Sequence, residues 1–178
     1  MKEIQYKKLK ANEITIDLFK NFNRYQKVSK CWRKVEDKWV LKDIAFTEEW
    51  TSKEYEFLVK CLQNTVNTGG VVFAAFKDES LAGFVSVENV LFGSEKEYLQ
   101  LSCIHVTFEG RGRGIGRGLF ELAVDSARKM GAKKLYISAH SSEESQAFYK
   151  KLGCVEAAEY NEKLVAEEPC DCQLEFVL

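Results

Sequence analysis

Proline is almost absent from this sequence, because Pro169 is the only one among 178 residues. No stretch rich in serine or glycine separates two apolar blocks, and the sequence shows no repeat and no low-complexity segment. Linkers between domains are usually rich in such residues. The whole chain, residues 1–178, is therefore predicted to form a single domain, and it is long enough to bury a substantial core.

A long apolar segment and an excess of charge of one sign are also missing. No apolar run approaches the roughly 20 residues of a membrane-spanning helix, and the basic start MKEIQYKKLK is not followed by the apolar region of a signal peptide. The 26 lysines and arginines stand against 27 acidic residues, which is unlike a general nucleic-acid-binding protein. We expect a cytoplasmic protein without membrane or nucleic-acid partners, whose six cysteines are reduced.

Metal-ligand patterns are scarce as well. The only closely spaced cysteines are Cys170 and Cys172, and the two histidines, His105 and His140, lie far from them in the sequence. A structural zinc site needs a full set of cysteine or histidine ligands, so no metal site is predicted. The Cys-x-Cys spacing is interpreted instead as alternate residues of a terminal strand.

The chain does contain apolar segments whose spacing predicts strands and helices in mixed order. Helices are predicted over residues 14–25, 51–66, 115–130 and 142–152. Strands are predicted over residues 4–9, 71–76, 84–92, 98–106, 134–140, 154–160 and 170–178. Residues 31–50, which hold all three tryptophans, receive no assignment. Hairpins at both ends, with two strand–helix units between them, indicate an α/β (α+β) fold with a mixed sheet.

The most distinctive segment is VTFEGRGRGIGRGLF, residues 106–120, which places glycines and arginines between two apolar runs. Glycine costs backbone entropy, so a cluster of glycines indicates that the backbone approaches something closely. The arginines indicate that this partner is an anion. The first N–H groups of a helix are unpaired and its dipole favours negative charge. The segment therefore predicts a phosphate site at the start of the following helix.

Other interpretations of this loop fit less well. A Walker loop needs a lysine followed by serine or threonine, which the segment lacks. A dinucleotide fingerprint starting at Gly112 would require glycine where Arg117 stands. Nucleic-acid-binding segments of the RGG type are usually repeated and disordered, whereas this loop is single and flanked by apolar periodicity. A purely structural glycine turn leaves the three arginines unexplained.

The spacing Arg111-x-x-Gly114-x-Gly116 resembles the R/Q-x-x-G-x-G/A pyrophosphate loop of the GNAT superfamily of acyl-CoA N-acyltransferases. A second segment, SQAFYKKLGC, is similar to the family's A-x-x-x-Y-x-x-x-G-F segment, with Tyr149 and Gly153 on its tyrosine and glycine. The resemblance is good over residues 71–155 and is limited to the general layout before them. It implies a single-domain GNAT-like fold, with a mixed, mostly antiparallel sheet flanked by helices.

The resemblance implies acetyl-CoA as the acyl donor, a primary amine of a small molecule or peptide as the acceptor, and no metal; it leaves a homodimer open. Backbone groups of Ile104 and Val106 would hold the pantetheine arm, and an N–H near Val106 would stabilise the oxygen of the tetrahedral intermediate. Ser142 stands where many members have asparagine, and it can still hydrogen-bond. The residues expected to contact the coenzyme are Ile104, Val106, Arg111, Gly112, Arg113, Gly114, Ile115, Gly116, Arg117 and Ser142.

The implied reaction is direct attack of a neutral amine on the thioester. Tyr149 is the expected general acid, which returns a proton to the departing thiolate. The general base stays open: Gln100 occupies a position where some members have glutamate, and Glu88, His105 and a chain of waters are the candidates. A non-catalytic acyl-CoA-binding or sensing module is the alternative function.

The acceptor has only weak signals in the sequence. Acidic residues, including the run from Glu156 to Asp171, are compatible with a cationic acceptor or with a solvated surface. The segment that contains Trp32, Trp39 and Trp50 is compatible with an acceptor pocket or with core packing.

Overall fold

The structure, a computed structural model, describes residues 3–178. Its main element is a seven-stranded sheet, whose strands in chain order are β1 (Gln5–Lys8), β4 (Val71–Lys77), β5 (Ser80–Val87), β6 (Tyr98–Val106), β7 (Lys134–Ala139), β8 (Val155–Glu156) and β9 (Cys172–Val177). The spatial order is β1-β4-β5-β6-β7-β9-β8, and only β6 and β7 run parallel. This confirms the predicted α/β fold with a mixed, mostly antiparallel sheet.

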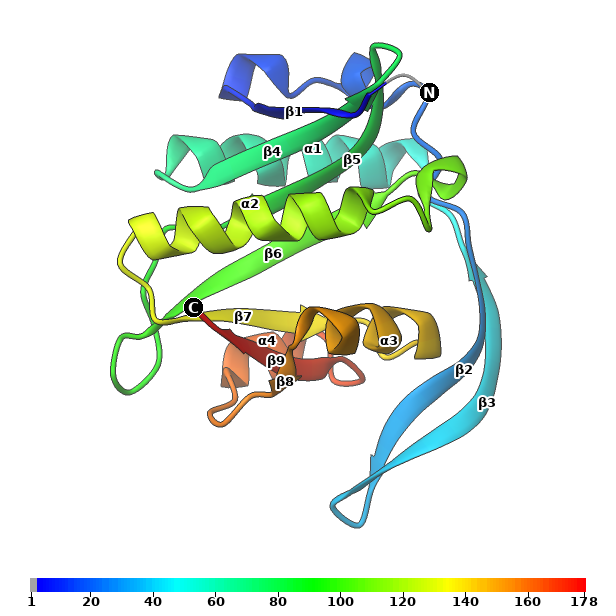
Figure 1. Cartoon of the computed structure of the whole chain (residues 1–178). Coiled ribbons are helices and arrows are strands. Elements are labelled where there is room, and N and C mark those ends of the chain that lie inside the picture. Colours follow the sequence, from blue (N-terminus) through cyan, green and yellow to red (C-terminus); the bar gives the residue numbers. More distant parts are fainter. Residues whose placement is uncertain (1–2) are drawn as a thin grey trace.

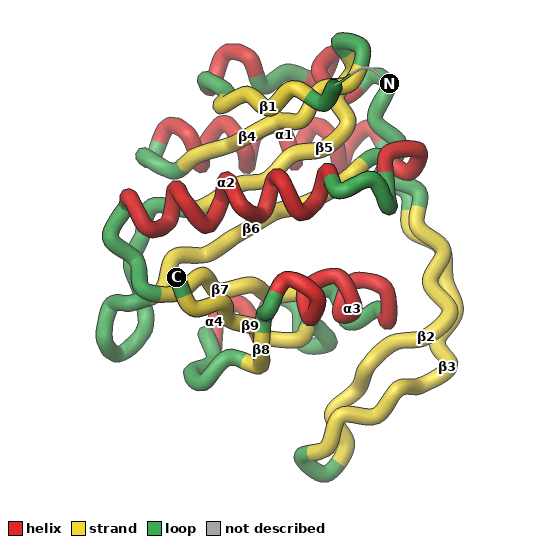
Figure 2. The backbone as a smooth tube through the Cα atoms, in the orientation of Figure 1, coloured by secondary structure: helices red, strands yellow, loops and turns green. Residues whose placement is uncertain are grey.

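Helices cover both faces of the sheet (Figure 1). Helix α1 (Ser52–Asn67) packs on one face, and α2 (Ile115–Lys129) packs on the other. Helix α3 (Glu143–Leu152) lies beside β7 and β9, and the short α4 (Glu162–Glu167) precedes β9. A separate two-stranded sheet of β2 (Gln26–Val35) and β3 (Lys38–Glu48) forms an arm at the side of the molecule (Figure 2).

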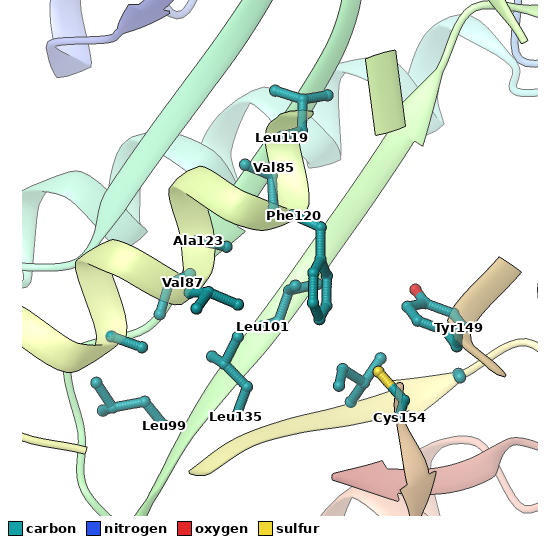
Figure 3. Packing of buried hydrophobic residues seen from close by; sticks show 14 of the residues in the cluster. Val85, Val87, Leu99, Leu101, Leu119, Phe120, Ala123, Leu135, Tyr149 and Cys154 are labelled. Carbon is teal, nitrogen blue, oxygen red and sulfur yellow. The ribbon is translucent and has the colours of Figure 1, made fainter. Parts of the chain in front are cut away.

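Alternation along the strands divides the core into two layers. On β4, Val72 and Ala74 are buried with α1 residues, whereas Ala75 is buried with α2 residues. Successive strand side chains point to opposite faces of a sheet, which explains this division. Figure 3 shows the α2 side, where Leu119 and Phe120 of the helix lie over the strands.

Helix α1 begins at a capping box that the sequence encodes. The Thr51 side chain accepts a hydrogen bond from Glu54 N, and the Glu54 carboxylate accepts one from Thr51 N. This arrangement satisfies N–H groups that the helix itself leaves unpaired. The predicted start of this helix is thus confirmed.

Two neighbouring turns of α1 provide a stability test. Leu62 is 1% exposed, whereas Phe57 on the same helix is 70% exposed. We expect Leu62→Ala to lower the free energy of unfolding by about 2–5 kcal/mol, because it removes buried contacts and leaves a cavity. Phe57→Ala should change it by no more than about 0.5 kcal/mol. Urea titrations of the two variants would measure this, and equal effects would contradict the observed orientation of α1.

The predicted helix over residues 14–25 is wrong. The chain forms two short 3-10 turns there, Ala11–Glu13 and Ile16–Phe19, and then becomes extended. The Asn23 side chain accepts a hydrogen bond from Tyr25 N at 3.0 Å. Asparagine side chains that bond nearby backbone groups in this way compete with helix formation.

The unassigned residues 31–50 belong mainly to the β2–β3 hairpin. Glu36 and Asp37 form its two-residue turn, with φ of 48° and 62°. Such left-handed turns are normally marked by glycine or asparagine, and this turn has neither, so it could not be predicted. The turn between β4 and β5 is similar, so β5 begins at Ser80 and ends at Val87, earlier at both ends than the predicted strand over residues 84–92.

The C-terminal prediction was also partly wrong. Only Val155–Glu156 of the predicted strand over residues 154–160 pairs as β8, and helix α4 was not predicted. Cys172 is buried at the start of β9, whereas Cys170 is exposed in the preceding turn. The interpretation of these cysteines as alternate residues of one strand therefore holds only for Cys172.

None of the helices within residues 3–178 combines the length and the apolar character that a bilayer crossing requires. Nor does that part of the chain gather three or more His, Cys, Asp or Glu side chains in a cluster suited to a metal ion.

Candidate active site

The sheet opens between β6 and β7. The two strands pair only from Tyr98 to Gln100, opposite Lys134 to Tyr136. The pairing of β6 with β5 shifts register between Cys103 and Leu101, which marks a bulge. A bulge bends its strand and increases the local twist. Beyond it β6 stays with β5 and diverges from β7, as Figures 1 and 2 show.

The edge of β6 at this opening carries backbone groups that no neighbouring strand pairs. Thr107 N donates to Ala82 O of β5 at 2.9 Å, so the backbone groups of alternate residues face β5. By the same alternation, the N–H and C=O groups of Ile104 and Val106 face the opening. The Val106 carbonyl accepts a hydrogen bond from Arg111 Nε at 3.2 Å. The structure thus leaves a strand edge that an extended ligand can pair with.

The glycine–arginine loop connects this strand edge to α2. Gly112 and Gly114 have φ of 74° and 82°, and a Cβ at either position would meet no atom within 4 Å. Gly114 is the N-cap of α2 and supplies no side-chain cap, so the first N–H groups of the helix have no capping partner. Unpaired N–H groups at a helix start, with open space in front of them, form a site for an anion.

A cavity of about 680 Å³, here called the loop cavity, lies between this loop and α3. Its lining includes Arg111, Gly112, Gly114, Gly116 and Arg117 of the loop and Phe148, Tyr149 and Leu152 of α3. The structure therefore brings the two sequence motifs, which are far apart in the chain, to one cavity.

A second cavity of about 480 Å³, here called the hairpin cavity, lies on the side of the β2–β3 arm. Its lining includes Arg33, Phe46 and Glu48 of the arm, together with Trp50, His140 and Asp171. The residues common to both cavities are Arg24, Gln26, Ile104, His105, Ser145 and Tyr149. We call this shared set the junction.

Most of the residues predicted to contact the coenzyme line the loop cavity. These are Ile104, Val106, Arg111, Gly112, Gly114, Ile115, Gly116 and Arg117. Arg113 is exposed and lies outside the lining. Ser142 also lies outside it, because it is fully buried as the N-cap of α3, where its hydroxyl accepts hydrogen bonds from Ser145 N and Gln26 Nε2.

Arg111 lies along the wall of the loop cavity. Besides its bond to the Val106 carbonyl, its Nη2 lies 3.5 Å from the Arg24 carbonyl. The guanidinium stands 5.5 Å from the centre of the Phe108 ring. Burial, and the nearby charge of Arg24, lower the pKa of Arg111. The side chain is therefore held in place beside the strand edge.

Tyr149 projects from α3 into the junction, and Figure 3 shows its hydroxyl directed away from the helix. The residue is 8% exposed, and burial raises the pKa of its phenol. Within residues 3–178 the hydroxyl makes no hydrogen bond. A hydroxyl at a cavity wall that the protein leaves unbonded is available to a ligand.

The candidates for the general base differ in position. Glu88 accepts hydrogen bonds from Thr65 and Ser102, each at 2.7 Å, and lines neither cavity. Gln100 pairs with Tyr136 of β7 and also lines neither cavity. His105 lies at the junction and lines both. Of these three side chains, only His105 lines both cavities, as Tyr149 does.

Aromatic rings and positive charges surround His105. Its ring lies 4.8 Å from that of Trp50 and 5.5 Å from that of Phe84. Burial, and the positive charges of Arg24 and Arg111, hold the pKa of His105 well below its usual range. The imidazole is therefore neutral at pH 7, and the same surroundings make it a weaker base than a solvated histidine.

This lowered pKa predicts a pH dependence of stability. The unfolded chain takes up a proton on His105 at about pH 6.5, whereas the folded protein does so only at lower pH. Stability from this residue is therefore present above about pH 6.5 and is lost as the pH falls below it. We expect His105→Gln to show a smaller loss of melting temperature between pH 7.5 and 5.5 than the unaltered protein. An equal loss in both would show that His105 titrates normally.

Arg24 and Glu48 belong to the site but were not predicted from the sequence. Arg24 Nη2 forms an ion pair with Glu48 Oε2 at 2.9 Å, and its guanidinium stacks 5.1 Å from the centre of the Trp50 ring. Glu48 Oε1 also lies 3.3 Å from His140 Nε2, and the contacts from His140 and Arg24 lower the pKa of Glu48. No motif marks these residues, and their roles depend on the unpredicted β2–β3 arm. Of the three tryptophans, Trp50 alone lines either cavity.

Comparison with known proteins agrees with this geometry. The model of the Acetyltransferase (GNAT) family matches residues 33–154. This chain belongs to the GNAT acetyltransferase family. No curated protein matches the chain by sequence.

Solved structures of acetyltransferases share the fold. A structure named as a streptothricin acetyltransferase from Bacillus anthracis, in complex with acetyl coenzyme A, has a TM-score of 0.75 at 14% identity over 99% of each chain. Nourseothricin acetyltransferase has a TM-score of 0.71 at 17% identity, also over 99% of each chain. The PaiA N-acetyltransferase of Thermoplasma acidophilum, in complex with coenzyme A, has a TM-score of 0.61 at 13% identity over 99% of this chain and all of the other. At these identities the similarity concerns the fold.

Proposed function

We propose that this protein is an N-acetyltransferase that moves the acetyl group of acetyl-CoA to a primary amine by direct attack, through a tetrahedral intermediate. The proposal rests on the arrangement of groups at the junction. An anion site, a free strand edge and an unbonded phenol meet there, between one cavity for a donor and another for an acceptor. Acetyl-CoA or coenzyme A is bound in two structures of this fold, which supports acetyl-CoA as the donor.

The loop cavity fits the coenzyme by charge and by shape. Five basic side chains line it against one acidic side chain: Arg24, Lys27, Arg111, Arg117 and Lys151 against Glu144. The diphosphate would lie against the N–H groups from Gly112 to Gly116, where Gly112 and Gly114 leave open space in place of a Cβ. The pantetheine arm would pair with the edge of β6 at Ile104 and Val106, which brings the thioester to the junction.

The strand edge also supplies a donor for the developing negative charge. The Val106 N–H faces the opening and is well placed to bond the thioester oxygen as the carbonyl carbon becomes tetrahedral. Such a donor acts most strongly where water is excluded. Arg24 Nε, which is buried without a hydrogen-bond partner within residues 3–178, is a second N–H group at the junction.

Proton transfers complete the reaction at the junction. As the amine nitrogen bonds the acetyl carbon, it becomes acidic, and the neutral His105 accepts its proton. The carbon–sulfur bond then breaks, and Tyr149 donates its proton to the departing thiolate. Burial disfavours both the thiolate and the phenolate, so the thiolate is also a stronger base here than in water. Solvent returns the proton from His105 to Tyr149.

The proposal is tested by following thiol release from acetyl-CoA with a panel of primary amines, together with calorimetric titration of coenzyme A. The expected result is binding of coenzyme A and turnover with at least one amine, with an acetylated product of the expected mass. Binding without turnover on any amine would favour a non-catalytic acyl-CoA-binding module. Failure to bind coenzyme A would contradict both functions.

A further inference from the structure

The two cavities carry opposite charge. The loop cavity is lined by five basic side chains and one acidic one. The hairpin cavity is lined by five carboxylates, those of Glu48, Glu49, Glu54, Glu168 and Asp171, and by two guanidinium groups, those of Arg24 and Arg33. The chain as a whole has a net charge of only -1. Charge is therefore separated across the junction, although it is balanced over the protein.

The basic groups of the hairpin cavity are already engaged. Arg24 pairs with Glu48 and donates to the Gln26 side chain at 2.9 Å. Arg33 donates to Ser141 Oγ at 2.7 Å and to the Trp32 carbonyl at 2.8 Å. The four other carboxylates of this cavity form no ion pair within residues 3–178. Arg33 forms no ion pair there either, so the unpaired charges that line this cavity are four negative and one positive. The excess of negative charge attracts ligands of positive charge.

Asp171 is the innermost of these unpaired carboxylates. It is half-buried, one of its oxygens accepts a hydrogen bond from Ser138 Oγ at 3.1 Å, and burial raises its pKa. Its charge also contributes to the raised pKa of Tyr149, which places it near the junction. A carboxylate that is partly desolvated and lacks a cation gains more from an ammonium ligand than a solvated one does.

The junction, unlike the hairpin cavity, favours the neutral form of an amine. Burial, and the charges of Arg24 and Arg111 in addition, lower the pKa of His105 there. The same two charges would lower the pKa of an amine nitrogen held beside His105, and so favour its neutral form, which is the form that attacks a thioester. The unpartnered Nε of Arg24, at a residue only 8% exposed, independently indicates that a ligand oxygen completes the junction.

We propose that the acceptor is an aliphatic polyamine, with at least two amino groups. One nitrogen reacts in its neutral form at the junction, while a second is held as an ammonium ion by Asp171 and the exposed Glu49 and Glu168. The charge separation thus sets both the substrate class and the nitrogen that is acetylated, namely the one farther from the carboxylates. This inference rests on the proposed function.

The test compares 1,4-diaminobutane and spermidine with butylamine, which lacks the second cation. Two readouts are used: thiol release from acetyl-CoA, and calorimetric binding of each amine to the protein saturated with coenzyme A. We expect kcat/KM for the diamines to exceed that for butylamine by about 10- to 100-fold, since a hydrogen bond to a charged group contributes on this scale. The preference should weaken as salt is raised.

Variants connect the preference to the hairpin cavity. Asp171→Asn keeps an oxygen that can accept from Ser138, and it should raise KM for the diamines by a larger factor than KM for butylamine. Glu168→Gln, at an exposed site that carries no folding risk, should do the same to a smaller extent. Glu162→Gln removes the same charge outside both cavities and should leave the preference unchanged.

The outcomes separate the inference from the function on which it rests. The polyamine proposal would be overturned if diamines and butylamine were bound and acetylated equally well. It would also be overturned if the preference for diamines persisted in both Asp171→Asn and Glu168→Gln. In either case the proposed acetyl transfer would stand. Tighter binding of diamines that depends on Asp171, without turnover of any amine, would support the binding site and overturn the proposed catalysis.

Discussion

Gly114→Ala is expected to weaken coenzyme A binding by about 10- to 100-fold, with a fold that stays intact. Gly114 caps α2 with φ of 82°, and a Cβ there would meet no protein atom within 4 Å. It would instead occupy the space from which a diphosphate approaches the N–H groups. Losing a hydrogen bond to a charged group costs about 1.5–3 kcal/mol, which corresponds to this loss of affinity. Calorimetric titration of coenzyme A measures it.

Gly131→Ala is the matched control for this prediction. Gly131 lies just beyond the opposite end of α2, with φ of 87° and no atom within 4 Å of the position of a Cβ. Both variants force a side chain into the left-handed region, so both should lower the free energy of unfolding by about 1 kcal/mol. Only Gly114→Ala should affect binding. An equal loss of affinity in both variants would mean that backbone strain, and not blocked access to the helix start, causes the effect.

Tyr149→Phe is expected to lower kcat by about 10²- to 10⁴-fold, the usual contribution of a positioned general acid. The hydroxyl bonds no group within residues 3–178, so its removal leaves no buried partner unsatisfied and should not lower stability. Coenzyme A binding should persist, because the anion site is unchanged. The measurement is thiol release at saturating substrate, together with thermal melting of both proteins.

Tyr136→Phe should show the reverse pattern. Tyr136 is fully buried on β7, where its hydroxyl donates to Gln173 Oε1 at 2.6 Å and accepts from Asn161 N at 2.8 Å. Its removal should cost about 1–3 kcal/mol of stability and leave kcat unchanged. If Tyr149→Phe kept full turnover, or lost stability as Tyr136→Phe does, Tyr149 would be a packing residue.

The parts of the site that could be predicted are those built from contiguous sequence. The glycine–arginine loop and the Tyr149 helix are local motifs, and their residues specify a helix start and a helix face directly. The same local logic predicted α1 from the helical spacing of its apolar residues and β4 from its apolar run. The residues predicted to contact the coenzyme line the loop cavity except Arg113 and Ser142, and their contact with the coenzyme stays a prediction.

The acceptor side could not be predicted because it depends on tertiary arrangement. The turn at Glu36 and Asp37 has left-handed backbone without glycine or asparagine, so the arm that carries Glu48 had no signal. Arg24 and Asp171 come from opposite ends of the chain and meet only around the folded junction. His105 could be named from the sequence, but its neutral state follows from the burial and the two arginines that surround it.

The proposed function depends most on the binding of a diphosphate by main-chain N–H groups of residues 112–116, at the start of α2. The most direct test is a pair of calorimetric titrations at neutral pH, one with coenzyme A and one with pantetheine, which keeps the thiol arm and lacks the phosphates. We expect coenzyme A to bind at least about 100-fold more tightly than pantetheine, since several charge-assisted hydrogen bonds are lost together. Equal affinities, or no binding of coenzyme A, would contradict the account.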